Sequence, residues 1–226
     1  MIDFNEGQTI CIDKPLTWSS FHVVKKVRFL TKAKKVGHAG TLDPLASGLL
    51  IICTGKHTKI INTYQGQDKE YIGSFKLGVT TASYDSEAEE ENPMPFDHID
   101  LDKIQDVIAK KFLGEISQVP PIFSAVKVGG KRAYDLARKG EEVVIQPKTI
   151  IIKEFEVLSY EAPIIRFRIV CGKGTYIRSI ARDLGKELGC GAYMTKLRRT
   201  KIGNFDVADA YSIERFEEMV TALKNG

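Results

Sequence analysis

The chain has 226 residues, of which 43% are hydrophobic and 27% are charged, with a formal net charge of +4 and a pI near 8.7. This composition is ordinary for a globular protein of one large domain or two small ones, and it is sufficient to bury a core. No apolar run is long enough to span a bilayer, and the polar, acidic start predicts that no signal peptide is present. The mild basic excess is compatible with a polyanionic partner without requiring one.

The four cysteines bear on the cellular compartment. Cys11, Cys53, Cys171 and Cys190 are far apart, form no C-x-x-C pair and have no histidine at metal-ligand spacing. This pattern favours separate thiols in a reducing compartment over disulfides or a metal site. We therefore expect a cytoplasmic protein without a metal.

The N-terminal part predicts a strand followed by an amphipathic helix. Residues 9–12 form a short apolar run that Pro15 ends, and Ser19 or Ser20 can cap the helix that follows. The residues expected on its inner face are Val23, Val24, Val27 and Leu30. The helix is followed by Lys32, Lys34 and Lys35, which form either a solvated surface or a set of phosphate contacts.

Residues 37–50, with the sequence Gly-His-Ala-Gly-Thr-Leu-Asp-Pro-Leu-Ala-Ser-Gly-Leu-Leu, form a candidate site. Three glycines and two small residues leave the backbone bare, so another molecule can approach it closely. The segment carries one imidazole, His38, and one carboxylate, Asp43, which Pro44 biases toward an extended backbone. It runs into 49–52, an apolar run typical of a buried strand. On spacing alone, a catalytic loop and a tight turn capped by Asp43 both remain open.

The middle of the chain predicts a short helix at 56–64, a strand at 69–77 and a surface loop at 80–98. Tyr71 in this strand is either a core residue or an aromatic that faces a pocket. A helix should begin after Asp100 and end at Gly114, with Leu101, Ile104, Val107, Ile108 and Phe112 at core spacing.

The segment 118–147 carries a second group of basic residues. A proline turn should lead into a strand ending at Lys127, and Gly129-Gly130 should break it. We expect a short basic helix from Lys131 to Lys139 that contains Arg132, Tyr134 and Arg138. Basic and aromatic residues on one helix suit a nucleic-acid backbone.

The C-terminal third predicts an antiparallel strand pair, a helix, another strand and a last helix. The strands are 148–160 and 164–171, and the strand at 193–199 leads to the last helix from about Ser212. In the first helix of this region, Arg178 and Arg182 are expected away from the inner face formed by Ile177, Ile180, Ala181, Leu184 and Leu188. The elements together predict an α+β fold, with a mixed, mainly antiparallel sheet flanked by helices.

The motifs limit the chemistry without naming a reaction. The segment 172–175 precedes a helix but lacks the spacing of a nucleotide-binding loop. Neither G-x-G-x-x-G nor G-x-S-x-G occurs, and no second carboxylate lies close to Asp43 as in a glycosidase pair. The residues favour a metal-free enzyme with one key carboxylate and a distributed basic surface.

A resemblance names the reaction. Residues 37–50 resemble the signature of the bacterial tRNA pseudouridine synthase B family, and four further segments resemble that family in the same order. These are Asp13-Lys14-Pro15 with Ser19-Ser20, then Lys69-Glu70-Tyr71, then Gln118-Val119-Pro120-Pro121 with Ser124-Ala125 and Lys127, and finally Gly174-Thr175-Tyr176-Ile177-Arg178-Ser179 followed by Leu197-Arg198-Arg199. The match covers residues 9 to about 205.

The resemblance implies a pseudouridine synthase fold with an active-site cleft across the sheet, in one catalytic domain over residues 1–226. It implies isomerisation of uridine 55 in the T loop of tRNA, by base flipping and without a cofactor. The partner would be the T stem-loop of tRNA, with no membrane and a monomeric enzyme. Many relatives continue into a small PUA-type RNA-binding domain, and we expect none in this chain.

The resemblance also assigns roles to residues. Asp43 would be the catalytic carboxylate, Arg178 its ion-pair partner and His38 a residue that fills the space left by the flipped base. Tyr71, Tyr176 and Leu197 would line the uracil pocket. Contacts to the RNA backbone are expected from Lys14, Lys32, Lys34, Lys35, Lys127, Lys131, Arg132, Arg138, Arg198 and Arg199.

Two departures and two alternatives accompany this hypothesis. Thr17 stands where the family usually has glycine, and Phe123 where tyrosine is common. The alternatives are a synthase with another RNA target, such as a guide-dependent relative, and a tRNA chaperone without turnover. The presence of Asp43, Tyr71 and Arg178 argues against pure binding.

Overall fold

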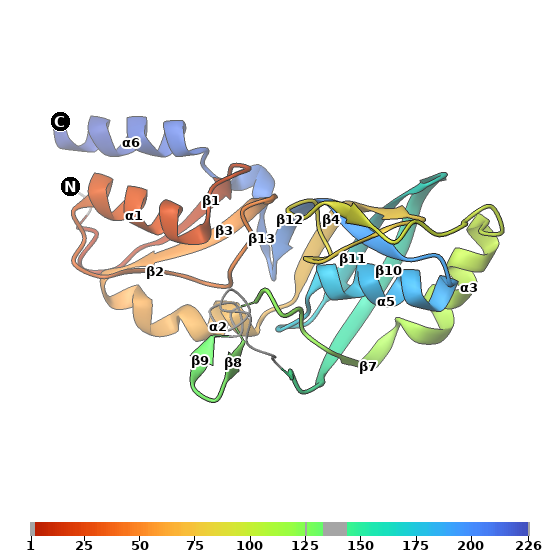
Figure 1. Cartoon of the computed structure of the whole chain (residues 1–226). Coiled ribbons are helices and arrows are strands. Elements are labelled where there is room, and N and C mark those ends of the chain that lie inside the picture. Colours follow the sequence, from red (N-terminus) through yellow and green to blue (C-terminus); the bar gives the residue numbers. More distant parts are fainter. Residues whose placement is uncertain (1–2, 125, 133–143, 226) are drawn as a thin grey trace. The chain divides into compact units, whose positions relative to one another are not determined.

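The computed structural model describes residues 3–124, 126–132 and 144–225. In chain order the elements are β1 (Thr9–Lys14), α1 (Ser20–Thr31), β2 (Val36–His38), β3 (Ala46–Thr54), a 3-10 helix (Gly55–Ile60), α2 (Ile61–Gly66), β4 (Lys69–Leu77), β5 (Thr80–Thr81), β6 (Glu90–Glu91), α3 (Leu101–Lys111), β7 (Gly114–Gln118), β8 (Lys127–Val128), β9 (Lys131–Arg132), β10 (Lys148–Glu161), β11 (Ile164–Cys171), α5 (Ile177–Leu188), β12 (Ala192–Ile202), β13 (Phe205–Asp206), a second 3-10 helix (Val207–Asp209) and α6 (Ile213–Asn225) (Figure 1).

The main sheet is mixed and mostly antiparallel. Its hydrogen-bonded order is β1-β3-β12-β4-β11-β10-β7, with β2 on β3 and β13 on β12. β12 runs parallel to β3, whereas β1 and β2 each pair with β3, and β10 pairs with β11 and β7, in antiparallel fashion. Helices flank these strands, so the predicted α+β class is confirmed (Figure 1).

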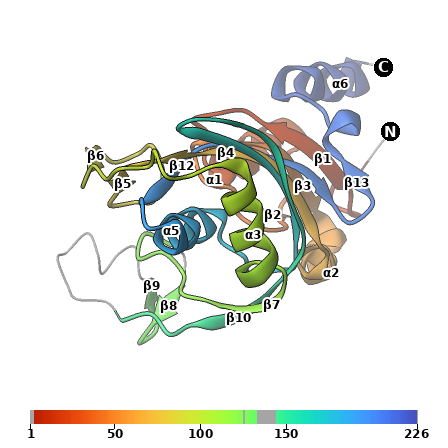
Figure 2. The same ribbon diagram turned by 90° about the vertical axis from the view of Figure 1, so that its right-hand side faces the viewer.

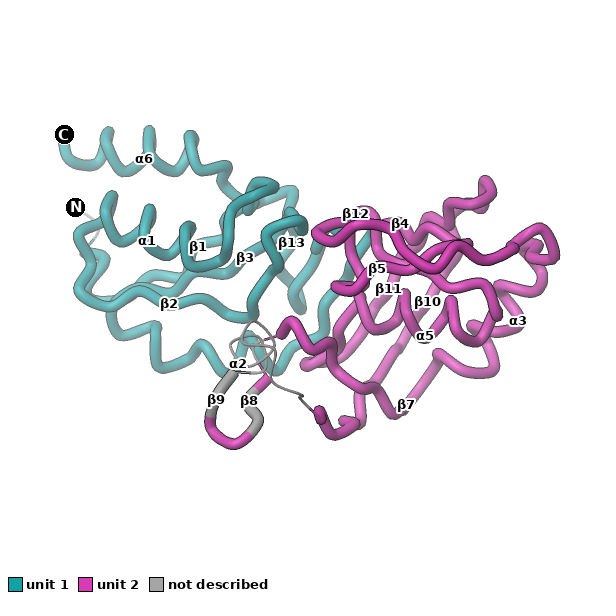
Figure 3. Tube along the Cα trace, viewed as in Figure 1, with its two compact units in different colours: residues 1–72, 197–226 teal, residues 73–196 magenta. Residues whose placement is uncertain are grey.

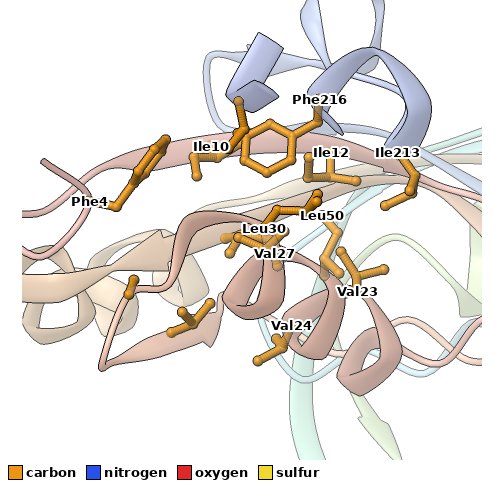
Figure 4. Packing of buried hydrophobic residues seen from close by; sticks show 14 residues of the cluster. Phe4, Ile10, Ile12, Val23, Val24, Val27, Leu30, Leu50, Ile213 and Phe216 are labelled. Carbon is orange, nitrogen blue, oxygen red and sulfur yellow. The ribbon is translucent and has the colours of Figure 1, made fainter. Parts of the chain in front are cut away.

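The chain forms two compact units, coloured separately in Figure 3. The first contains residues 1–72 and 197–226, and the second contains residues 73–196. The first unit has its core between α1, α6, β1 and β3 (Figure 4). The predicted inner face of α1 is confirmed, because its four residues are all buried there: Val23, Val24, Val27 and Leu30. Ser19 caps this helix by accepting a hydrogen bond from the His22 backbone N–H.

The second unit contains β7, β10 and β11 with α3 and α5 (Figure 2). Phe167 on β11 stacks on Phe75 with ring centroids 4.1 Å apart. Phe155 on β10 packs edge-on against Phe167, with ring centroids 6.2 Å apart. The predicted α3 is confirmed, with Asp100 as its cap. Of its five expected core residues, Ile104, Ile108 and Phe112 are buried, whereas Leu101 is exposed.

Two expectations for this part of the fold were wrong, and one strand was not predicted. The segment 80–98 is not simply a loop, because it contains the β5–β6 pair and a buried carboxylate, Asp85. No local pattern indicated β7, which pairs with β10. Lys131 and Arg132 form a strand paired with β8 rather than the start of a helix. The rest of that predicted helix, with Tyr134 and Arg138, lies outside the described residues.

Among the described residues, none of the helices combines the length and apolar character that crossing a membrane requires. The four cysteines are all free thiols, as expected, and Cys53, Cys171 and Cys190 are buried.

Candidate active site

The glycine-rich loop between β2 and β3 is fixed on both sides of Asp43. On one side, the Ser20 Oγ accepts a hydrogen bond from the Leu42 N–H at 2.9 Å and donates one to the Leu42 carbonyl at 3.1 Å. On the other, the Pro44 carbonyl accepts a hydrogen bond from the Thr17 N–H at 2.8 Å. Asp43 itself is half-buried. The start of α1 and the turn before it therefore hold the residues that flank the carboxylate.

Thr17 stands where the resemblance implies a glycine, and its backbone adopts a conformation that favours glycine. Its φ is +69°, in the left-handed region that non-glycine residues rarely adopt. The turn that supports Pro44 is thus formed despite the substitution.

The far end of the loop is set by β12. Leu197 lies opposite Ala46, and Arg199 lies opposite Gly48, in the parallel pairing of β12 with β3. Gly48 has φ +105°, and a Cβ atom there would lie 2.2 Å from the Arg199 carbonyl oxygen. Only glycine permits this close approach of the two strands.

The buried side chain of Arg199 donates hydrogen bonds to the backbone on both sides of Asp43. Its Nε donates to the Leu49 carbonyl at 2.8 Å, and its Nη2 donates to the Gly40 carbonyl at 3.2 Å. The side chain is 1% exposed. Arg199 therefore supports the Asp43 loop rather than presenting its charge at the surface, which does not favour the expected contact with RNA phosphate.

Lys14 is a second buried cation beside the loop. It is fully buried, and its ammonium donates to the carbonyls of Pro15 at 2.9 Å and Trp18 at 2.6 Å. Desolvation lowers the pKa of Lys14 from 10.5 to about 8, and the charge of Asp43 is the strongest of the effects that oppose this shift. Lys14 is therefore an internal neighbour of Asp43 and, like Arg199, is poorly placed for a phosphate contact.

His38 lies at the end of β2, opposite Ile52 of β3, and is half-buried. Burial lowers the pKa of its imidazole below 6.5, and the charge of Arg199 adds to this effect although the Gly40 carbonyl opposes it. The ring is consequently neutral at pH 7.

Tyr71 and Leu197 lie on the same face of the sheet as Arg199. The Thr200 hydroxyl contacts the Glu70 carboxylate at 2.7 Å, so these two side chains share one face of the neighbouring strands β4 and β12. Since side chains alternate along a strand, Tyr71, Leu197 and Arg199 share the other face. Tyr71 and Leu197 are each 8% exposed. The first unit thus contains His38, Asp43, Tyr71 and Leu197 of the predicted site.

The second unit contains the other two predicted site residues. Tyr176 precedes α5, and Gln118 binds it on both sides: the amide oxygen accepts from the Tyr176 N–H at 2.9 Å, and the amide nitrogen donates to its carbonyl at 3.1 Å. Arg178 was expected away from the inner face of α5, and this was wrong, because its side chain is buried. It donates to the carbonyls of Ser83 and Phe123 at 3.2 and 3.0 Å.

The burial of Arg178 is explained by a carboxylate that sequence reasoning missed. Asp85 Oδ2 lies 3.5 Å from Arg178 Nε, with side chains 3% and 6% exposed. Asp85 in turn accepts hydrogen bonds from the Ser83 hydroxyl at 2.5 Å and the Glu87 N–H at 3.0 Å. A buried ion pair is stable only when its attraction and additional hydrogen bonds compensate for the loss of solvation. A lone Asp in a polar segment carries no sequence signal for this role.

The remaining basic residues differ in exposure. Lys32, Lys34 and Lys35 are exposed and stay candidates for phosphate contacts. Arg198 is half-buried, and it donates two hydrogen bonds to the carboxylate of Asp13, at 3.0 and 2.7 Å. Lys127, Lys131 and Arg132 contribute to β8 and β9, whose backbone alone is described, and Arg138 lies outside the described residues. Within the described part of the chain, no group of three or more histidine, cysteine or acidic residues could hold a metal ion.

Comparison with known proteins identifies the family. Residues 28–177 match the model of the TruB family pseudouridylate synthase N-terminal domain, and residues 178–226 match the tRNA pseudouridylate synthase B C-terminal domain. The chain belongs to the tRNA pseudouridine synthase B family. It is 50% identical to the tRNA pseudouridine synthase B of Phocaeicola vulgatus, over 96% of this chain and 94% of that protein. The family member of Flavobacterium johnsoniae is 52% identical, over 96% of this chain and 97% of that protein.

Solved structures share the fold of this chain. A chain in the crystal structure of a Cbf5-Nop10-Gar1 complex matches with a TM-score of 0.76 and 30% identity, over 98% of this chain and 56% of that one. A chain of an H/ACA RNP bound to a substrate RNA containing 2'-deoxyuridine matches with a TM-score of 0.73 and 27% identity, over 99% of this chain and 56% of that one. This family member is a tRNA pseudouridine synthase, an isomerase that acts on uridine in tRNA.

Proposed function

We propose that this enzyme isomerises the uridine at position 55 in the T loop of tRNA and that Asp43 is its catalytic carboxylate. The observation that carries the proposal is the loop itself. Asp43 is half-buried between two residues whose backbones are hydrogen-bonded to the start of α1 and the turn before it, Leu42 and Pro44. A carboxylate held this way needs little reorganisation when substrate arrives.

The reaction suits a carboxylate. The bond between uracil N1 and ribose C1′ breaks, the base turns, and a bond forms between C5 and C1′. The proton lost from C5 is balanced by the proton gained at N1. A carboxylate can act as the nucleophile in such a sequence or move the proton. Asp43 supplies this group, and the nearby ammonium of Lys14 favours its ionised form.

The target base must leave its stack to reach Asp43. Extruding a nucleotide costs a few kcal/mol, part of which stacking against an aromatic or apolar surface recovers. Tyr71 and Leu197, on one face of the sheet in the unit that contains Asp43, are suited to hold the uracil. The neutral ring of His38 would fill the space that the base leaves in the RNA, as the family resemblance implies.

Residues of the second unit complete the proposal. The resemblance assigns Tyr176 and Arg178 to substrate binding. The support within the second unit is that Gln118 fixes the Tyr176 backbone and that Asp85 and two carbonyls orient the guanidinium of Arg178.

The test is incubation with an unmodified tRNA transcript, followed by chemical mapping of pseudouridine. We expect product at position 55 with the wild type, and none with a transcript that carries cytidine there. Asp43→Asn should bind tRNA about as well as the wild type and form no pseudouridine. Asp209→Asn, an exposed aspartate of the same unit, is the matched control and should retain turnover. Turnover by Asp43→Asn would refute the role of Asp43, and product at another position would refute the proposed target.

A further inference from the structure

Helix α1 presents two aromatic rings on the side opposite its buried face. Figure 4 shows Val23, Val27 and Leu30 in the core. Phe21 and Phe29, in contrast, are 56% and 64% exposed. Single exposed apolar residues are normal on protein surfaces. Positions i, i+4 and i+8 form one row that turns by about 40° per step, so the two rings lie on one side of the helix with Lys25 between them.

A lysine ammonium lies over each of the two rings. The Lys25 Nζ lies 4.8 Å from the ring centroid of Phe21, and the Lys32 Nζ lies 4.3 Å from that of Phe29. Phe21, Lys25, Phe29 and Lys32 are referred to below as the α1 stripe. The helix has no acidic residue in its sequence, so nothing within it neutralises the lysines of the stripe.

The α1 stripe begins beside the candidate active site. Ser20, the residue before Phe21, is bonded through its hydroxyl to the backbone of Leu42, next to Asp43. From there the stripe runs about 12 Å along the helix, at 1.5 Å per residue, from Phe21 to Phe29. Beyond its end lie two further exposed lysines, Lys34 and Lys35.

The chemistry of the stripe selects its partner. Alternating cations and aromatic faces suit a chain of phosphates that also carries bases, since lysines bind phosphates and aromatic rings stack on bases. A second copy of this chain or another protein would have to bring an acidic surface with apolar groups at matching positions. A nucleic acid meets both requirements along its whole length.

We propose that the α1 stripe is an RNA-docking surface, which binds the part of the tRNA that remains outside the pocket around Asp43. This rests on the proposed function in that the RNA is taken to be the substrate. On docking, Lys25 and Lys32 leave the rings for phosphates, which their flexible stems allow. The rings of Phe21 and Phe29 then stack on unpaired bases.

The experiment measures tRNA affinity by filter binding over a range of salt, together with the single-turnover rate at saturating enzyme. Phe21→Ala/Phe29→Ala should weaken binding at least tenfold and leave the saturating rate unchanged. Lys25→Gln/Lys32→Gln should reduce the slope of log affinity against log salt by about 0.7 to 0.9 for each phosphate that the variant no longer binds. The control is Leu113→Ala/Leu158→Ala, which removes two exposed apolar side chains of the second unit, 44% and 50% exposed, and should change neither quantity.

Affinity within twofold of the wild type for the phenylalanine variant, or an unchanged salt slope for the lysine variant, would overturn the proposal. An equal loss of affinity in the leucine control would also overturn it. Urea unfolding of each variant separates weakened binding from a loss of structure, and the lysine variant gives an answer of its own if the phenylalanine variant does not fold. A wild type that binds tRNA and makes no pseudouridine at position 55 would refute the proposed function. The tRNA affinities of the stripe variants would still test the docking surface in that case.

Discussion

Replacing Gly48 by alanine tests whether the close approach of β3 and β12 sets the geometry of the Asp43 loop. At φ +105° a residue with a Cβ is strained, which costs about 1–2 kcal/mol. The new Cβ would also lie 2.2 Å from the carbonyl oxygen, 2.8 Å from the nitrogen and 3.0 Å from the carbonyl carbon of Arg199. These are backbone atoms, so the strands themselves must separate, and overpacking of this kind costs about 1–3 kcal/mol.

The two effects together predict a loss of about 2–5 kcal/mol in the free energy of unfolding for Gly48→Ala. With an m value of about 2 kcal/mol/M, the urea midpoint should fall by about 1–2.5 M. The assay is equilibrium urea unfolding followed by circular dichroism. We also expect reduced turnover, because Gly48 lies five residues after Asp43 and any shift of β3 is transmitted to the loop.

The matched control is Gly66→Ala. Gly66 is the last residue of α2, and a Cβ there would meet no heavy atom within 4 Å. Alanine is the better helix former by about 1 kcal/mol, so the midpoint should stay the same or rise. An unfolding free energy for Gly48→Ala within 1 kcal/mol of the wild type would refute the reasoning from strand approach.

Three further predictions concern buried polar groups. Asp85→Ala removes the carboxylate that pairs with the buried guanidinium of Arg178, and it should lower the unfolding free energy by about 3–5 kcal/mol. A double variant that also carries Arg178→Met should recover part of this loss. Full stability of Asp85→Ala would contradict the prediction. Because the pKa of Lys14 falls from 10.5 to about 8 on folding, the folded state binds fewer protons between these pH values. Stability of the wild type relative to Lys14→Met should therefore rise by up to about 3 kcal/mol from pH 8 to 10.5, whereas a flat difference would disprove the shift. Gln118→Ala removes two hydrogen bonds to the Tyr176 backbone and should lower the unfolding free energy by about 1–3 kcal/mol. Gln118→Glu should retain the hydrogen bond that the Tyr176 N–H donates. Equal stability of Gln118→Ala and the wild type would show that these two hydrogen bonds do not stabilise the fold.

Local patterns in the sequence predicted much of the fold and located the loop. The period of Val23, Val27 and Leu30 defines the buried face of α1, because a helix that packs on a sheet buries one stripe whatever its partner is. Alternation predicted β11, where Ile165 and Phe167 are buried as expected. The strands that were not predicted, β2, β5, β6, β7 and β13, are short, and their local pattern is weak without the neighbouring strand.

The identity of the internal charged residues, in contrast, follows from the fold alone. Their residue type predicts a surface position for three basic side chains: Lys14, Arg178 and Arg199. Lys14 and Arg199 were also expected to contact phosphate. Each is buried because residues distant in sequence supply acceptors for it, such as Asp85 for Arg178 and the Leu49 and Gly40 carbonyls for Arg199. Spacing along one chain holds no record of such partners. The order of the residues is therefore enough to locate the carboxylate loop and to assign the family, whereas long-range hydrogen bonds in the folded protein hold that loop in place.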